Sequence, residues 1–151
     1  MQWMIMPLRR YAEFTGRSRR MEFWMFGLFN LIVYAVLFAI AFGAGLGANF
    51  QGVDASNPLA IYGAFFSGAG LLIAVWWLAM VIPSISVSVR RLHDRDMSGW
   101  WYLGIIVASL IPIVGGIAGI VMLVIFCLPG TPGPNRFGPD PKDPTSAEVF
   151  A

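Results

Sequence analysis

The sequence predicts an all-α, polytopic membrane helical bundle, and three observations carry this prediction. Only 12% of the 151 residues are charged, while 58% are hydrophobic, whereas soluble domains carry roughly a quarter charged residues. Residues 23–53, 55–89 and 97–135 form three stretches without any charge. Each is longer than the about 20 apolar residues that a helix needs to cross a bilayer. Finally, almost every arginine lies in two segments that such a bundle would place on the same side of the membrane.

Three apolar segments within one membrane domain, residues 1–141, are the predicted spans: residues 24–48, 59–89 and 100–128. The first two are separated by a turn-rich loop, residues 49–58, which contains no lysine or arginine. Arg90 and Arg91 end the second segment, because an arginine inside the hydrocarbon core is costly. A flexible tail is expected over residues 142–151.

The third segment has two interpretations. Residues 111–116 (IPIVGG) divide it into two apolar arms of about a dozen residues, each about 18 Å long as helix and too short to cross alone. A single kinked crossing, which we favour, places the C-terminal tail outside. A re-entrant hairpin instead returns the tail to the cytoplasm, provided that protein shields its turn.

The arginines predict the orientation of the chain. Five of them precede the first span, at positions 9, 10, 17, 19 and 20, and three more lie at positions 90, 91 and 95. The loop at residues 49–58 has none, so the positive-inside rule places the N-terminus and the 90–95 connection in the cytoplasm of a multi-pass protein. A net charge of only +2 does not support binding to nucleic acid.

The most polar short segment is residues 90–96 (RRLHDRD). Its arginines suit bidentate contact with a phosphate or lipid headgroup, and His93 with Asp94 could act as an acid–base pair. The ordinary interpretation is that the arginines anchor a helix end while the acids neutralise them. We assign no catalytic residue, no cofactor and no metal site, because one histidine beside aspartates lacks a second group of ligands.

Two further features suggest partners. The basic block at residues 16–24 could hold anionic lipid or act only as a topology signal. Glycines four residues apart, in residues 43–47 and 115–119, allow close helix contact and are compatible with a homo-oligomer or with packing inside one chain. The spans contain no aspartate, glutamate, lysine, arginine or histidine, which argues against a proton-coupled carrier.

Four motifs occur in a recognisable order: residues 14–24 (FTGRSRRMEFW), 90–94 (RRLHD), 98–101 (SGWW) and 129–141 (PGTPGPNRFGPDP). Over about residues 10–141 the chain resembles the domain-of-unknown-function 805 family, the YhaH-like small inner-membrane proteins of bacteria. The resemblance implies a helical bundle in the bacterial cytoplasmic membrane. It implies no particular activity, substrate or cofactor.

We expect the polar motifs to pack together at the cytoplasmic interface, with Glu22 and Asp94 as partners for arginines of other segments. The candidate residues for this inter-segment cluster, or for a lipid or partner site, are Arg17, Arg19, Arg20, Glu22, Arg90, Arg91, His93, Asp94, Asn135, Arg136 and Asp140. The leading hypothesis is a non-enzymatic envelope or interaction protein that contacts anionic lipid or a membrane-protein partner. The alternatives are a small oligomeric channel or carrier, and an interfacial enzyme that uses His93 and Asp94.

Overall fold

The computed structural model describes residues 2–43, 46–66, 68 and 70–143, and within these residues it is helical, with no strand beyond one isolated bridge at Asn135 and Gly138. The prediction of an all-α fold is confirmed. The elements are α1 (Gln2–Arg9), α2 (Arg20–Gly43), η1 (Leu46–Phe50), α3 (Pro58–Phe66), α4 (Gly70–His93), α5 (Trp100–Ala108) and α6 (Pro112–Cys127). Most of the predicted flexible tail, and residues 44 and 45 of the first glycine-rich motif, lie outside the described residues.

Two helices, α2 and α4, are long and apolar enough to cross a membrane. Each has 24 residues and is therefore about 36 Å long, compared with a hydrocarbon core of about 30 Å. The predicted second span does not form one continuous helix, because Gly68 adopts a φ of +57° that ends α3 before α4 begins. At its other end α4 continues past the predicted limit and includes both Arg90 and Arg91.

The chain forms two compact units, of which one comprises residues 27–82. In this unit Ala41 of α2 and Ile73 of α4 are buried together, surrounded by Tyr34, Leu37 and Phe65. The short helix α3 begins where Asn57 accepts hydrogen bonds at its side-chain oxygen from the backbone N–H groups of residues 59 and 60. Asn57 followed by proline is a typical helix start, since the side chain satisfies free N–H groups and proline needs none.

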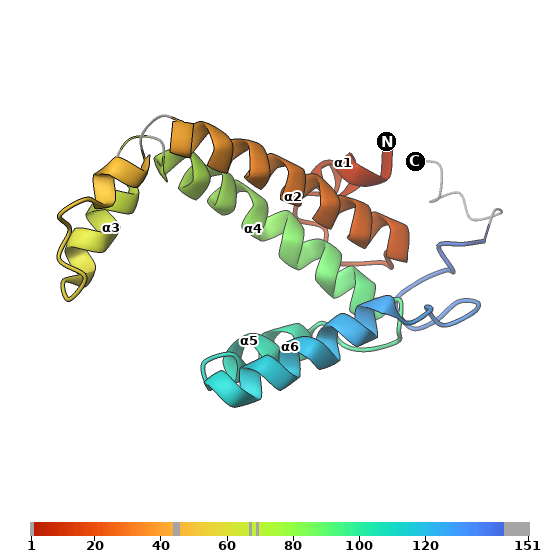
Figure 1. Cartoon of the computed structure of the whole chain (residues 1–151). Helices are drawn as coiled ribbons and strands as arrows, with labels where there is room; N and C mark the ends of the chain where they lie inside the picture. Colours follow the sequence, from red (N-terminus) through yellow and green to blue (C-terminus); the bar gives the residue numbers. More distant parts are fainter. Residues whose placement is uncertain (1, 44–45, 67, 69, 144–151) are drawn as a thin grey trace. The chain divides into compact units, whose positions relative to one another are not determined.

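The other unit comprises residues 1–26 and 83–151, and it contains α1, α5, α6 and the adjoining ends of α2 and α4. Its apolar core consists of Leu92, Met122 and Phe126, with Phe23, Tyr102 and Ile105 among the side chains packed against it. Helices α5 and α6 lie side by side as an antiparallel hairpin (Figure 1). The single kinked helix favoured from sequence is therefore wrong as a description of residues 100–128.

The hairpin turn is explained by its sequence. Pro112 cannot donate the hydrogen bond that would continue α5, and it occupies the first turn of α6 instead. Gly115 then passes so close to the end of α5 that a Cβ atom there would lie 2.6 Å from Cα of Ser109. A larger residue at this position would force the two helices apart.

Candidate functional site: a buried charge cluster and its docked tail

Within the described residues, five charged side chains are buried together in the unit that contains the hairpin. They are Arg17 before α2, Glu22 in the first turn of α2, Arg90 and Arg91 in the last turn of α4, and Asp94 just after it. Each of these side chains is at most 3% exposed. We call these five residues the buried charge cluster. Because a buried charge without a partner is strongly unfavourable, the pairing inside the cluster determines whether this part of the chain can fold.

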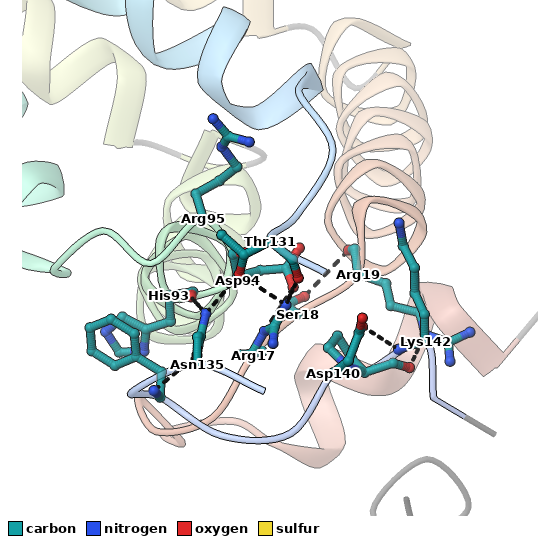
Figure 2. Close-up of polar contacts among 12 residues, drawn as sticks. Arg17, Ser18, Arg19, His93, Asp94, Arg95, Thr131, Asn135, Asp140 and Lys142 are labelled. Atoms are coloured by element: carbon teal, nitrogen blue, oxygen red, sulfur yellow. Dashed lines mark hydrogen bonds and ion pairs between the residues drawn. The ribbon is translucent and has the colours of Figure 1, made fainter. Parts of the chain in front are cut away.

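Asp94 joins two arginines that are far apart in the sequence. Its Oδ1 accepts a hydrogen bond from Nε of Arg17 at 3.0 Å and lies 2.9 Å from Nη2 of the same guanidinium. Its Oδ2 accepts a hydrogen bond from Nη1 of Arg91. One carboxylate therefore holds the segment before α2 against the end of α4, and both of its oxygen atoms are occupied by arginine. Figure 2 shows Arg17 and Asp94 of this contact.

The tail segment, residues 129–141, is fixed to the same place by its backbone. Nη2 and Nη1 of Arg17 donate to the carbonyl oxygens of Thr131 and Gly133, each at 2.6 Å. The N–H of Thr131 donates to the carbonyl oxygen of Asp94 at 2.8 Å. Nδ2 of Asn135 donates to the carbonyl oxygen of His93 at 2.9 Å. An apparently irregular, proline-rich segment is thus held by specific hydrogen bonds to two other parts of the chain (Figure 2).

Arginine side chains also cap the C-terminal end of α6. The pairs are Arg20 to the carbonyl of Cys127 (3.2 Å), Arg91 to the carbonyls of Phe126 (3.2 Å) and Leu128, and Arg95 to the carbonyl of Pro129 (2.5 Å). The last carbonyl groups of a helix have no partner within the helix, and they carry its negative partial charge. Arginines at this end satisfy both requirements, and they tie the hairpin to α2 and α4.

Arg90 and Glu22 form a second buried ion pair, with Nη2 and Oε1 2.8 Å apart. No nitrogen of this guanidinium meets hydrogen-bond geometry with any described residue, so the attraction between the two charges dominates the contact. The backbone contributes as well, because the carbonyl of Arg90 accepts a hydrogen bond from the N–H of Ser18 at 3.1 Å. The pair therefore joins the start of α2 to the end of α4 independently of Asp94.

The loop between α1 and α2 is held at one further point. The Ser86 hydroxyl donates to the carbonyl of Glu13 at 2.5 Å, and the Glu13 carboxylate accepts hydrogen bonds from Arg10 at 2.6 and 2.7 Å. The hydrogen bond from Arg10 holds the pKa of Glu13 below its usual value. Both side chains of this pair are partly exposed, so its contribution to stability is at most about 1 kcal/mol.

Within the residues that the structure describes, no hydrogen bond joins the side chains of His93 and Asp94. Nδ1 of His93 lies 3.2 Å from the carbonyl oxygen of Gly16, which can only accept, so the ring proton is on Nδ1. The imidazole stacks on the ring of Phe137 with centroids 3.9 Å apart and planes 4° apart. Since Asp94 is occupied by two arginines, the histidine is oriented by the backbone and by an aromatic ring of the tail.

The remaining candidate residues lie around the cluster rather than in it. Arg19 donates to the carbonyl of Pro141 and lies over the ring of Trp3 at 5.3 Å. Arg136 pairs with Asp96 at 3.1 Å, and both side chains are about half exposed. Asp140 accepts hydrogen bonds from the backbone N–H groups of residues 133 and 142 and so shapes the tail itself.

The candidate residues chosen from the sequence did not include several that hold these contacts: Ser18, Ser86, Gly130, Thr131 and Phe137. Gly130 offered the clearest signal, since it separates a proline from a threonine in a segment with too many breakers for a helix. A Cβ atom at Gly130 would lie 2.5 Å from Cγ of Asp94. Only glycine therefore allows the tail to approach this carboxylate closely.

No group of three histidine, cysteine, aspartate or glutamate residues that could hold a metal ion occurs in the part of the chain that the structure describes. The fold and this site together define a small helical protein with two membrane-capable helices and a buried arginine–carboxylate cluster on which its C-terminal tail docks.

The chain belongs to the family described as "Protein of unknown function (DUF805)", whose model matches residues 11–139. It is 38% identical to the Inner membrane protein YhaH of Escherichia coli K12. The alignment covers 94% of this chain and 98% of that protein. Inner membrane protein YhaI of the same strain is 37% identical, with 94% and 97% covered. Uncharacterized protein YiiR is 29% identical, with 87% of each chain covered. No solved structure matches the chain. The family resemblance expected from the four motifs is confirmed.

Proposed function

We propose that this chain is a non-enzymatic, multi-pass inner-membrane protein whose two ends both lie in the cytoplasm and whose exposed basic residues contact anionic lipid headgroups. The docking of the tail segment on the buried charge cluster carries this proposal. Because Arg17, Asp94 and Thr131 are in direct contact, the segments before α2, after α4 and after α6 share one side of the membrane. In this arrangement α2 and α4 each span the membrane. The α5–α6 hairpin enters and leaves the membrane on the same side.

The charge distribution supports the cytoplasmic assignment of that side. All ten lysine and arginine residues of the chain lie in the three segments that meet at the cluster: Arg9, Arg10, Arg17, Arg19, Arg20, Arg90, Arg91, Arg95, Arg136 and Lys142. The connection between α2 and α4 has none. Basic residues near membrane helices are retained in the cytoplasm, and the names of the relatives agree with an inner-membrane location.

The dimensions of the hairpin support its re-entrant placement. Helix α5 has 9 residues and α6 has 16, so they are about 14 Å and 24 Å long, and neither reaches across a core of about 30 Å. Apolar side chains at the turn are nevertheless exposed, with Leu110 81% and Ile113 79% accessible. Lipid chains of the cytoplasmic leaflet would cover this surface, and the arginine caps would hold the other end of the hairpin at the interface.

The basic residues outside the cluster provide the contact with lipid. Arg9, Arg20, Arg136 and Lys142 are exposed, and each basic residue near an anionic surface contributes about 1 kcal/mol of attraction. The cluster itself is not available to an external phosphate, because its guanidinium groups are buried against acids and carbonyl groups. Both oxygen atoms of Asp94 accept hydrogen bonds from arginine, which disfavours the interfacial-enzyme alternative.

Cysteine labelling tests this topology. In a Cys127→Ser background, Ser56→Cys in the outer loop should react with a membrane-impermeant maleimide added to intact spheroplasts. Lys142→Cys, at a position that is also exposed, should react only after the membrane is permeabilised. Labelling of Lys142→Cys in intact spheroplasts at the rate of Ser56→Cys would place the tail outside and overturn the proposal.

A further inference from the structure

A groove of about 460 Å³ lies beside the cluster, within the same unit, between the end of α4 and α5. Val89 from α4 and Leu103 and Ile106 from α5 form its apolar wall, while His93 and Ser98 lie at its polar edge. This volume is within the range of ligand-binding pockets, which are typically apolar with a few polar groups that fix the ligand's orientation. The buried charge cluster does not use this groove.

The two polar residues have unused hydrogen-bonding capacity. Since Nδ1 of His93 donates to the carbonyl of Gly16, the neutral ring has a lone pair on Nε2, for which the described residues provide no partner. Ser98 Oγ accepts from the N–H of Trp100 at 3.4 Å, and within the same residues its hydroxyl proton has no acceptor. The groove therefore presents one acceptor and one donor next to an apolar wall.

A positive charge lies next to this polar edge. Arg136 bonds to the backbone and side chain of Asp96, two residues before Ser98. Its guanidinium also lies 4.8 Å from the ring of Phe137, which stacks on His93. Arginine has five N–H donors, and this one is 61% exposed at its side chain, so it can bind an oxyanion in addition to Asp96.

We propose that this groove binds one glycerophospholipid molecule, with an acyl chain along the apolar wall and a headgroup containing phosphate and hydroxyl groups at the polar edge. A headgroup hydroxyl donates to Nε2 of His93, the hydroxyl of Ser98 donates to a phosphate or ester oxygen, and Arg136 supplies the opposite charge. Phosphatidylglycerol has this combination, whereas phosphatidylethanolamine has no net negative charge and no headgroup hydroxyl. The inference rests on the proposed function, which places the groove in the cytoplasmic leaflet.

Lipid binding to the full-length, delipidated protein in mild detergent tests the proposal, with native mass spectrometry as the readout. The protein should bind one dioleoyl phosphatidylglycerol about tenfold more tightly than dioleoyl phosphatidylethanolamine, because the hydrogen bond to His93 and the attraction between the net negative headgroup and Arg136 are both added. Leu103→Trp fills the groove and should reduce this affinity about tenfold. Leu123→Trp is the matched control, because Leu123 is on α6 with 55% exposure, compared with 48% for Leu103, and it should have no effect.

A second variant addresses the headgroup. His93→Asn retains an N–H close to the position of Nδ1 and removes the Nε2 lone pair, so it should abolish the preference for phosphatidylglycerol. Dioleoylglycerol and glycerol phosphate separate the two parts of the ligand, and each should bind more weakly than the complete lipid. Equal affinities for all lipids, or equal losses in Leu103→Trp and Leu123→Trp, would overturn the proposal. The maleimide labelling of Lys142→Cys reports on topology alone, so the two proposals can fail independently.

Discussion

Replacing Asp94 by asparagine tests the central contact of the structure. The change preserves the size of the side chain and removes the charge that Arg17 and Arg91 share. Breaking a buried ion pair by removing one partner costs about 3–5 kcal/mol, because the other charge remains buried. For a chain of this size each kcal/mol shifts the melting temperature by about 2–4 °C. We therefore expect Asp94→Asn to melt about 6–20 °C below the wild-type protein.

The melting temperature can be followed by tryptophan fluorescence in mild detergent, since the chain contains six tryptophans. Asp96→Asn is the matched control two residues away. Asp96 also pairs with an arginine, Arg136, but that pair is exposed and should contribute at most about 1 kcal/mol. Asp96 has a φ of +57°, a value that asparagine adopts readily. If Asp94→Asn lowered the melting temperature no more than Asp96→Asn, the buried carboxylate would not hold the segments together.

Two further changes test the tail and the second ion pair. Gly130→Ala should lower the melting temperature, because the added Cβ would collide with Asp94. Gly116→Ala in α6 is the control and should not lower it, because a Cβ at this position has nothing within 4 Å. Equal melting temperatures of the two variants would show that the tail does not approach Asp94. Glu22→Arg and Arg90→Glu should each destabilise by about 3–5 kcal/mol. Combining them should restore about 0.5–3 kcal/mol relative to the sum of the single changes, and strictly additive losses would exclude a direct pair.

The apolar helices could be predicted from the sequence, but their interruptions could not all be located. The uncharged stretches indicated helices, and Pro112 with its neighbouring glycines marked the division of the third segment. Gly68 did not predict a break between two helices, because one glycine lowers the stability of a helix by only about 1 kcal/mol and is often tolerated. Its positive φ depends on how α3 and α4 are connected, which a linear pattern does not contain.

Sequence reasoning selected the residues of the buried charge cluster but could not assign their partners. Arg17 and Asp94 are 77 positions apart, and any of several arginines could have neutralised either acid. The hydrogen-bond acceptors of the arginines could not be predicted either, since most of them are backbone carbonyls at the end of α6 and in the tail segment. Carbonyl groups have no residue signature, so their role becomes apparent only once the chain is folded.

The reliance of Arg17 on the tail segment has a consequence for biogenesis. The ribosome makes residues 129–141 only after α2, α4 and the hairpin, so Arg17 lacks its carbonyl acceptors at Thr131 and Gly133 while the earlier helices are inserted. A nascent chain would stay in a loosely assembled, protease-sensitive state until this stretch emerges. Prematurely terminated products would therefore be distinguishable to membrane quality-control proteases, which would degrade them in preference to full-length copies.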